Sequence, residues 1–360
     1  MTAWKNRRIL DLLEIELPVI QAPMAGANGA DMVVAVGRAG GLGSLPCAQL
    51  SPAQVVVAVQ QIRAQMSAPF NLNFFCHSSP DLDSPEVRTR LAEWRQHLAP
   101  FYEEAGLASD TPFPLSSRAP FDNTYCRVVE EARPAVVSFH FGLPAPDLLA
   151  RVKASGAKIL SSATTVSEAR WLEARGVDAI IATGAEAGGH RASFLQMDMS
   201  RQVGTFALVP QIVDAISLPV IAAGGIADGR GVAAALMLGA SAVQVGTAYL
   251  LTSEATISDA HRTALLTAAD DSTQITNVFT GRPARGISNR AMRDLGPLSP
   301  LAPDFPLAGG ALTPLKASAA LNGATEFSNM WSGQAAALAN LANAATLTRL
   351  LAADALTLLN

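Results

Sequence analysis

Among the five histidines of the chain, His190 stands in the setting most suited to catalysis, directly after Gly188 and Gly189. An imidazole suits general base chemistry because its ordinary pKa, near 6.5, lies close to working pH. The two glycines allow a close approach of the backbone to a bound ligand. Glu186, four residues earlier, is either a carboxylate that orients this imidazole or a charge at the start of a helix. The sequence therefore predicts a general base at His190.

Two further glycine-containing segments are suited to binding an anion. Gly224 and Gly225 follow an apolar run, and Gly246 and Thr247 follow the next one. Glycines let backbone N–H groups approach an anion closely, and a helix that begins near Gly229 would point its positive end the same way. Together the two segments predict a phosphate site.

His140 lies between two aromatic residues, Phe139 and Phe141. This setting favours an apolar pocket, so we interpret all three as substrate contacts rather than as catalytic groups. The remaining histidines, in polar or helical contexts, are interpreted as structural: His77, His97 and His261. Since no HxH, HExxH or acidic cluster occurs, no metal ion is expected.

Eight short apolar runs alternate with helix-like stretches along the chain. They cover residues 17–23, 41–46, 69–75, 135–139, 158–162, 178–183, 218–223 and 242–246. The runs are continuous rather than alternating, which is typical of parallel strands buried on both faces. The pattern predicts an α/β fold, a (β/α)8 TIM barrel, with a doubly wound open sheet as the alternative. Helices are expected over 51–66, 167–175 and 229–238, and a barrel would gather the histidines and glycines at one mouth.

Two regions interrupt this alternation. Residues 77–133 are too long and too rich in proline for one strand–helix unit, so we expect an inserted lobe after the third strand. Beyond about Ser253 the strand signals stop. The sequence thus predicts a barrel over 1–252, with 77–133 as an insertion, and a mainly helical C-terminal extension over 253–360 that packs on the barrel. The apolar face of this extension covers the barrel, packs on the insertion or joins a second subunit in a homodimer.

Composition narrows the class of protein. Of the 360 residues, 49% are hydrophobic and 16% are charged, which excludes a disordered chain. The net charge of −4 argues against a nucleic-acid partner, and no run approaches the ~18 apolar residues of a membrane span. Three widely spaced cysteines, Cys47, Cys76 and Cys126, are expected as free thiols. With no signal peptide visible, we expect a cytoplasmic protein.

Taken together and in order, these segments resemble the nitronate monooxygenase family, formerly called 2-nitropropane dioxygenases. The most specific match is residues 186–191 (EAGGHR). The others are 21–26 (QAPMAG), 71–75 (NLNFF), 138–142 (SFHFG), 161–165 (SSATT), 222–226 (AAGGI), 244–247 (QVGT), 280–286 (TGRPARG) and 327–334 (FSNMWSGQ).

The resemblance implies a TIM-barrel enzyme that uses FMN and O2 to oxidise alkyl nitronates, and neutral nitroalkanes after deprotonation, to carbonyl compounds and nitrite. His190 would take the proton next to the nitro group. The implied FMN contacts are Ala22, Pro23, Met24, Asn73, Lys158, Thr183, Gly188, Gly189, Gly224, Gly225, Gln244, Val245, Gly246 and Thr247. Thr183 departs from the glutamine expected before the glycine of its loop, and it reaches less far.

Other functions fit parts of the same pattern. An FMN-dependent NAD(P)H oxidoreductase, such as an enoyl or quinone reductase, would share the fold and the cofactor. A flavin-free epimerase or lyase would use the phosphate loops for a phosphorylated substrate. A catalytically inactive binding module is the third alternative, and the glycines and His190 at one mouth argue against it.

Overall fold

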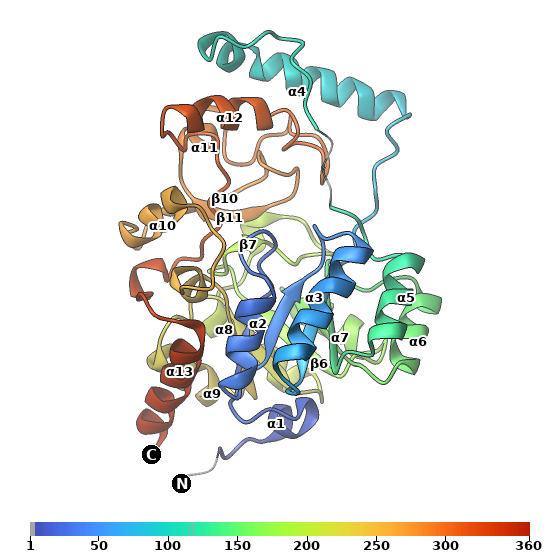
Figure 1. Cartoon of the computed structure of the whole chain (residues 1–360), viewed down its shortest axis with the longest axis vertical. Helices are drawn as coiled ribbons and strands as arrows, with labels where there is room; N and C mark the ends of the chain where they lie inside the picture. The colour runs from blue at the N-terminus through green and yellow to red at the C-terminus, as the bar shows by residue number, and fades with distance from the viewer. Residues whose placement is uncertain (1–3, 115, 117) are drawn as a thin grey trace.

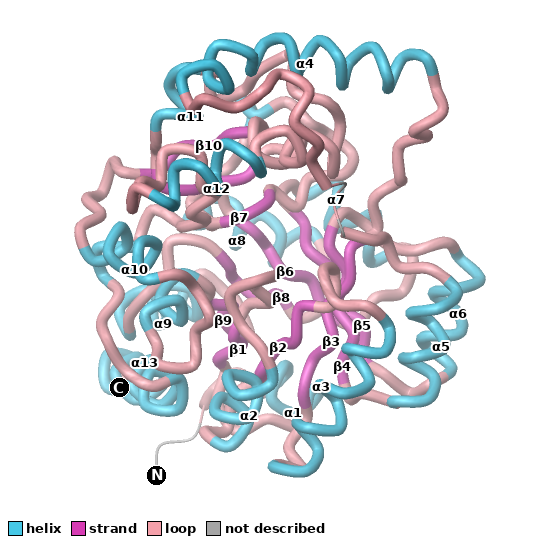
Figure 2. Tube along the Cα trace, turned by 45° about the horizontal axis from the view of Figure 1, so that its top comes forward, coloured by secondary structure: helices cyan, strands magenta, loops and turns pink. Residues whose placement is uncertain are grey.

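The computed structural model describes residues 4–114, 116 and 118–360. Within them, eight parallel strands form the centre: β1 (Val19–Gln21), β2 (Gly43–Pro46), β3 (Phe70–Phe75), β4 (Val136–His140), β5 (Lys158–Ala163), β6 (Ala179–Thr183), β8 (Val220–Ala223) and β9 (Ala242–Val245). Their hydrogen-bonded order is β1-β9-β8-β6-β5-β4-β3-β2, and Figure 2 shows these strands together at the centre of the barrel. A parallel bridge between Ile20 and Leu42 nearly closes the ring. The structure confirms the predicted TIM barrel, and the open doubly wound sheet was the wrong alternative.

The strands are apolar on both faces because each face packs against a different layer. In β6, Ile180 contacts the surrounding helices, whereas Ala179 and Ile181 fill the inside of the barrel. Helix α1 (Arg8–Leu13) adds Ile9, Leu10 and Leu13 to this inner core, which closes the barrel at one end. The other end of the barrel stays open for a site.

Helices alternate with the strands around the barrel. They are α2 (Ala30–Arg38), α3 (Pro52–Gln65), α5 (Asn123–Ala132), α6 (Pro146–Ala154), α7 (Val166–Glu173), α8 (Thr205–Ala215) and α9 (Gly229–Met237). The three helices expected from the sequence are confirmed. Helix α3 begins with a capping box, in which Ser51 Oγ accepts the Gln54 N–H and Gln54 Oε1 accepts the Ser51 N–H at 2.8 Å.

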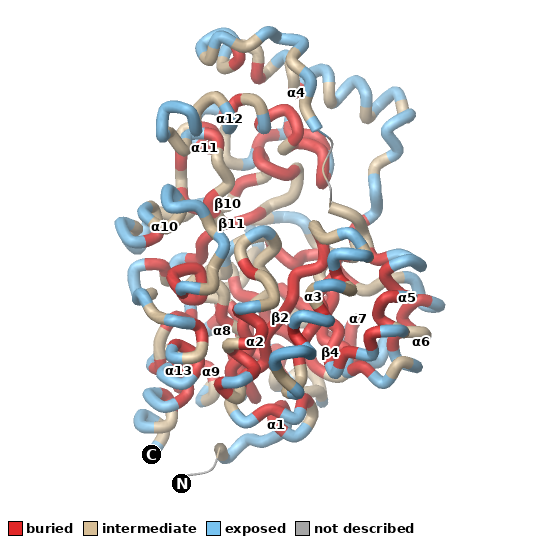
Figure 3. The backbone as a smooth tube through the Cα atoms, in the orientation of Figure 1, coloured by how far each residue is buried: buried red, intermediate tan, exposed pale blue. Residues whose placement is uncertain are grey.

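The described residues of the range 77–133 form two helices with different surroundings. Helix α4 (Pro85–Glu104) lies away from the barrel, above α11 (Arg290–Asp294) and α12 (Thr313–Leu321) (Figure 1), and exposes much of its length (Figure 3). Its inner face is anchored on the C-terminal part of the chain. Trp94 Nε1 donates to the Ala308 carbonyl at 3.0 Å, and the Tyr102 hydroxyl donates to the Ala311 carbonyl at 2.6 Å. Helix α5 instead packs between α3 and α6 on the barrel.

The C-terminal region mixes helices with strands. It contains α10 (Asp259–Leu266), β10 (Thr273–Thr276), β11 (Ala284–Ile287), α11 (Arg290–Asp294), α12 (Thr313–Leu321) and α13 (Ala344–Leu359). The described residues also form short 3-10 helices, which are η1 (Met199–Arg201), η2 (Thr247–Leu251) and η3 (Ala336–Leu338). Strands β10 and β11 form an antiparallel sheet with β7 (Gly189–His190), which comes from the barrel. The strand signals of the sequence stop near Ser253, yet β10 and β11 lie beyond it. The division into domains at residues 77, 133 and 252 stays a prediction.

Helix α13 returns to the barrel and packs against α9 and α2, so both described ends of the chain lie near the closed end of the barrel (Figure 1). The three cysteines are free thiols, as predicted. Within the described ranges, no helix is both long enough and apolar enough to cross a bilayer.

Candidate active site

A cavity of about 600 Å³ lies at the open end of the barrel. Its walls come from the loops that follow the strands and from residues 256–335 of the C-terminal region. The predicted site residues that line it are Ala22, Pro23, Met24, Asn73, His140, Thr183, Gly188, Gly189, His190, Gly224, Gly225, Gln244, Gly246 and Thr247. The structure therefore brings most of the predicted set into one place.

Four predicted residues do not line this cavity. Lys158 is exposed at the first position of β5, at the opposite end of the strand from the cavity. Phe139 and Val245 alternate with lining residues and therefore point outward into the helix layer; Phe139 packs against Phe121 at a ring distance of 5.2 Å. Phe141 lies behind the site, with its ring 4.5 Å from that of His140. We therefore withdraw direct ligand contacts for these four side chains.

The glycine segments form a cradle of backbone amides. Gly224 and Gly225 have φ angles of +113° and +70°, which glycine adopts without strain. In the described part of the chain, the N–H groups of Gly225, Gly246 and Thr247 have no hydrogen-bond acceptor. The Asp228 carboxylate accepts the N–H groups of Arg230 and Gly231 in the first turn of α9, and the expected contribution of this helix to anion binding stays a prediction. The free loop amides are therefore available to an anionic ligand.

Gln244 adds an unsatisfied group to the cavity wall. Its Oε1 atom is buried and has no hydrogen-bond partner in the part of the chain that the structure describes. Asn73, on β3, donates its amide N–H to Ser138 Oγ at 2.9 Å, so this side chain is held in place at the cavity wall. A buried acceptor without a donor is costly unless a ligand supplies one. The wall is thus shaped for a polar ligand.

His190 is fixed between the barrel and the C-terminal region. As part of β7 it pairs with Ala284 of β11, and its carbonyl lies 3.2 Å from His140 Nε2. Its own Nε2 lies 3.0 Å from Thr280 Oγ1. Aromatic rings surround the imidazole, with Phe305 at 5.3 Å and Trp331 at 5.5 Å.

The electrostatic surroundings keep this imidazole neutral. Burial lowers the pKa of His190 well below its usual range, and the positive charges of Arg118 and Arg282 lower it further. A neutral imidazole is the form that can accept a proton. The site thus has the protonation state that a general base requires.

Glu186 does not orient His190. Its two carboxylate oxygens accept the Thr205 N–H at 2.9 and 2.8 Å, and the Thr205 hydroxyl donates to one of them at 2.9 Å. Thr205 is the first residue of α8, so of the two interpretations the charge at a helix start is confirmed.

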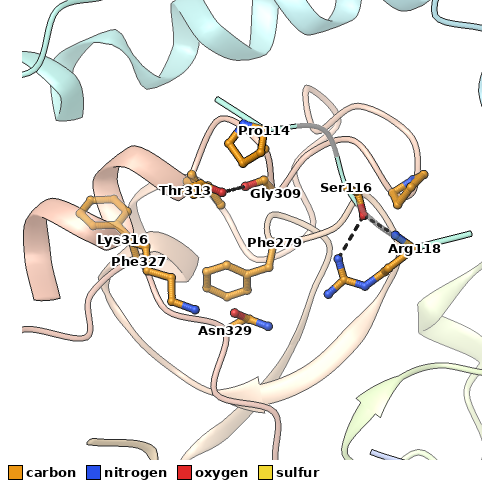
Figure 4. A pocket seen from close by; sticks show the side chains of 12 residues that line it. Pro114, Ser116, Arg118, Phe279, Gly309, Thr313, Lys316, Phe327 and Asn329 are labelled. Atoms are coloured by element: carbon orange, nitrogen blue, oxygen red, sulfur yellow. Dashed lines mark hydrogen bonds between the residues drawn. The ribbon is translucent and has the colours of Figure 1, made fainter. Parts of the chain in front are cut away.

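Two cations at the site were not found by sequence reasoning. Arg118 and Lys316 line both the main cavity and a neighbouring cavity of about 230 Å³, shown in Figure 4. Neither forms a salt bridge within the described residues, and Arg118 contacts Ser116 Oγ through its guanidinium at 3.4 Å. Arg118 lies in a proline-rich segment without periodicity, so no sequence signal marked it.

Two histidines interpreted as structural also lie at or near the site. His261 lines the cavity, with Nε2 3.1 Å from the Trp331 carbonyl. His77 is buried beside Phe305 at a ring distance of 4.7 Å.

Arg191, next to the proposed base, is fully buried and donates to the carbonyls of Thr183 and Gly184. Its side chain thereby fixes the loop that carries His190.

A family model described as nitronate monooxygenase matches residues 6–354. The chain belongs to the nitronate monooxygenase family. It is 42% identical over 347 residues to the nitronate monooxygenase of Paraburkholderia phytofirmans, covering 95% of this chain and 93% of that one. The nitronate monooxygenase of Pseudomonas aeruginosa is 41% identical, with 96% and 97% covered.

Solved structures show the same likeness. A nitroalkane oxidase from Streptomyces ansochromogenes matches with a TM-score of 0.85 and 34% identity, covering 97% of this chain and 98% of that one. FabK from Thermotoga maritima matches with a TM-score of 0.69 and 27% identity, covering 98% and 96%. As a nitronate monooxygenase family member, the chain is a flavin-dependent oxidoreductase that acts on a small molecule. This sets aside the flavin-free barrel and the inactive binding module.

Proposed function

We propose that this enzyme binds FMN and uses O2 to oxidise alkyl nitronates to carbonyl compounds and nitrite. The observation that supports this most directly is the arrangement of the cavity, where a neutral imidazole, two cations and a cradle of free amides share one space. Its volume of about 600 Å³ is within the usual range for small-molecule and cofactor sites.

The residues present fit FMN. The free N–H groups of Gly225, Gly246 and Thr247 would hold its phosphate, and Gln244 Oε1 would accept a hydrogen bond from its ring system. Met24 and Asn73 line the same wall. FMN, when bound, supplies the redox chemistry, whereas the protein positions the substrate and sets the polarity around it.

His190 provides the proton chemistry for neutral nitroalkanes. Its unprotonated ring removes the proton from the carbon next to the nitro group, which leaves a nitronate anion beside an imidazolium. Arg118 and Lys316 place positive charge at the same cavity, and Arg118 has no carboxylate partner among the described residues. These charges favour the anionic nitronate over the neutral nitroalkane.

The proposal is tested on the purified protein with its cofactor. We expect heat denaturation to release FMN, identified by mass spectrometry. With ethyl nitronate, we expect O2 consumption and nitrite formation, both measured in the same sample. A released flavin other than FMN would contradict the cofactor, and turnover without nitrite would contradict the reaction.

The second candidate is an FMN-dependent NAD(P)H oxidoreductase, an enoyl or quinone reductase on the same barrel. The structural likeness to FabK favours it. Anaerobic mixing with NADH in a stopped-flow instrument separates the two functions. Rapid loss of flavin absorbance with NADH, and none with ethyl nitronate, would favour the reductase.

A further inference from the structure

The only hydrogen bond recorded for the His190 ring within the described residues is to Thr280. Thr280 Oγ1 lies 3.0 Å from His190 Nε2, although the two residues are 90 positions apart. Thr280 is 1% exposed, so water does not compete for its hydroxyl. His190 Nδ1 makes no hydrogen bond in the described ranges. This atom is not completely buried, because it is absent from the set of buried polar atoms that lack a partner. Nδ1 is therefore the ring nitrogen that remains accessible.

The neighbours of the Thr280 hydroxyl determine which way its proton points. A hydroxyl donates one hydrogen bond and can accept two. Oγ1 lies 3.3 Å from the Arg282 carbonyl, which can only accept, and 3.4 Å from the Arg282 N–H, which can only donate. When the hydroxyl donates to that carbonyl, its remaining position is filled by a proton on His190 Nε2. All of its hydrogen-bonding positions are then satisfied.

The segment that carries Thr280 is held rigidly. The Gly281 N–H donates to the Asn277 carbonyl at 2.7 Å, and Gly281 has a φ of +86°. Val278 and Phe279 are buried in the core that α4 covers. Because the backbone on both sides is fixed, the hydroxyl cannot move far to adapt to the other form of the ring.

We propose that Thr280 is a positioning residue that keeps the ring proton of His190 on Nε2, so that Nδ1 presents its lone pair to the substrate. This inference rests on the proposed function, in which His190 deprotonates the nitroalkane. In that step the C–H bond next to the nitro group breaks and its proton moves to Nδ1. The electron pair of that bond forms the C=N bond of the nitronate, and the electrons of an N=O π bond move onto oxygen. The other ring proton stays on Nε2, which donates it in a hydrogen bond to Thr280 Oγ1.

The kinetic test compares two substitutions in the FMN-loaded enzyme. Thr280→Val has a similar shape but no hydroxyl, so either ring form becomes accessible. We expect kcat/KM for nitroethane to fall roughly 10- to 100-fold, the effect of losing a hydrogen bond to a charged group. Thr280→Ser keeps the hydroxyl and should recover activity to within about threefold of the unsubstituted enzyme. Both variants should keep their activity on preformed ethyl nitronate, which needs no deprotonation.

A spectroscopic test reads the ring directly and does not depend on activity. In protein labelled with 15N-histidine, the His190 signals among the five histidines are identified by their loss in His190→Asn. We expect the Nε2-protonated form in the unsubstituted enzyme and in Thr280→Ser, and a mixture of both forms in Thr280→Val. An Nδ1-protonated ring in the unsubstituted enzyme would overturn the proposal. A ring that is still protonated only on Nε2 in Thr280→Val would also overturn it.

Thr276→Val is the matched control. Thr276 is buried in the same region, and within the described ranges its hydroxyl makes a single hydrogen bond, accepted from the nearby Val278 N–H at 3.2 Å. If Thr276→Val lowers nitroethane activity as much as Thr280→Val, the effect is structural and the proposal fails. Loss of activity in His190→Asn without loss in Thr280→Val would overturn the role of Thr280 alone. Unchanged nitroethane activity in His190→Asn would overturn the proposed base, and with it the catalytic role of Thr280.

Discussion

Among the described residues, no carboxylate orients His190, and its ring instead contacts a hydroxyl and a set of aromatic rings. A carboxylate partner would raise the pKa of the imidazole, whereas burial and the charges of Arg118 and Arg282 lower it. The ring therefore stays neutral at the start of the reaction. The imidazolium that forms is stabilised mainly by the nitronate produced beside it.

A base at His190 is needed for neutral nitroalkanes but not for preformed nitronates. We expect His190→Asn to lower kcat/KM for nitroethane by ~10²–10⁴-fold, the usual contribution of a positioned acid–base group. Most activity on preformed ethyl nitronate should remain, because no proton has to be removed. Steady-state kinetics with both substrates measures this. His97→Asn, on α4 and outside the cavity, is the control, and an equal loss on both substrates in His190→Asn would exclude the role as base.

His140 links the site to the pH dependence of stability. Burial and the charge of Arg282 lower its pKa to about 4, below the value near 6.5 of the unfolded chain. The unfolded state therefore binds more protons between these values, so the free energy of unfolding falls as pH drops from about 6.5 to about 4. Full titration would remove on the order of 3 kcal/mol. Urea unfolding at pH 7 and pH 5 measures the slope, and His140→Asn should reduce it; an unchanged slope would contradict the assignment.

Single site residues were predictable from the sequence where neighbouring residues indicated their chemistry. His190 beside two glycines, and the paired glycines after two strands, carry their meaning in the local sequence. Arg118, Lys316 and Trp331 do not, because tertiary packing alone brings them to the cavity. The role of Glu186 stayed open for the same reason, since its partner Thr205 lies 19 residues away.

At the scale of elements, the loops after β6 and β8 support each other through close backbone packing. A Cβ atom on Gly224 would lie 2.8 Å from Thr205 Oγ1 and 3.1 Å from the Ala187 N atom. The same residue has a φ of +113°, which side chains rarely allow. The glycine is therefore needed for the shape of the amide cradle as well as for access to it.

Gly224→Ala should weaken FMN binding at least roughly tenfold and lower the free energy of unfolding by about 1–3 kcal/mol, because both strain and contact oppose the new side chain. Fluorescence titration of the apoprotein with FMN and urea unfolding measure the two effects. Gly29→Ala is the control, because a Cβ there meets nothing within 4 Å and the φ is −133°. FMN binding that is equal in the two variants would contradict the cradle.

The barrel strands were predictable because each forms a continuous apolar run, a pattern set by burial on two faces. The sheet of β7, β10 and β11 was not. Its strands have two or four residues, and β7 pairs with a strand from a distant part of the chain. Hydrophobic periodicity needs a longer segment than this to be visible.

At the scale of the whole molecule, α13 fastens the end of the chain to the barrel. Leu351 is 1% exposed in the main core, whereas its neighbour Leu350 is 49% exposed. We expect Leu351→Ala to lower the free energy of unfolding by ~2–5 kcal/mol and Leu350→Ala by less than about 0.5 kcal/mol. Urea unfolding of both variants checks this. Equal values would show that α13 does not contribute to the folded core.

The cavity is bounded by residues as far apart along the chain as Ala22 and Ala335. A ribosome synthesises the first of these long before the last. A nascent polypeptide that has completed only its barrel strands therefore still lacks Trp331, Ser332 and Gly333 as a wall. A coenzyme that contacts the whole cavity wall therefore requires residues up to Ala335 to have been synthesised first.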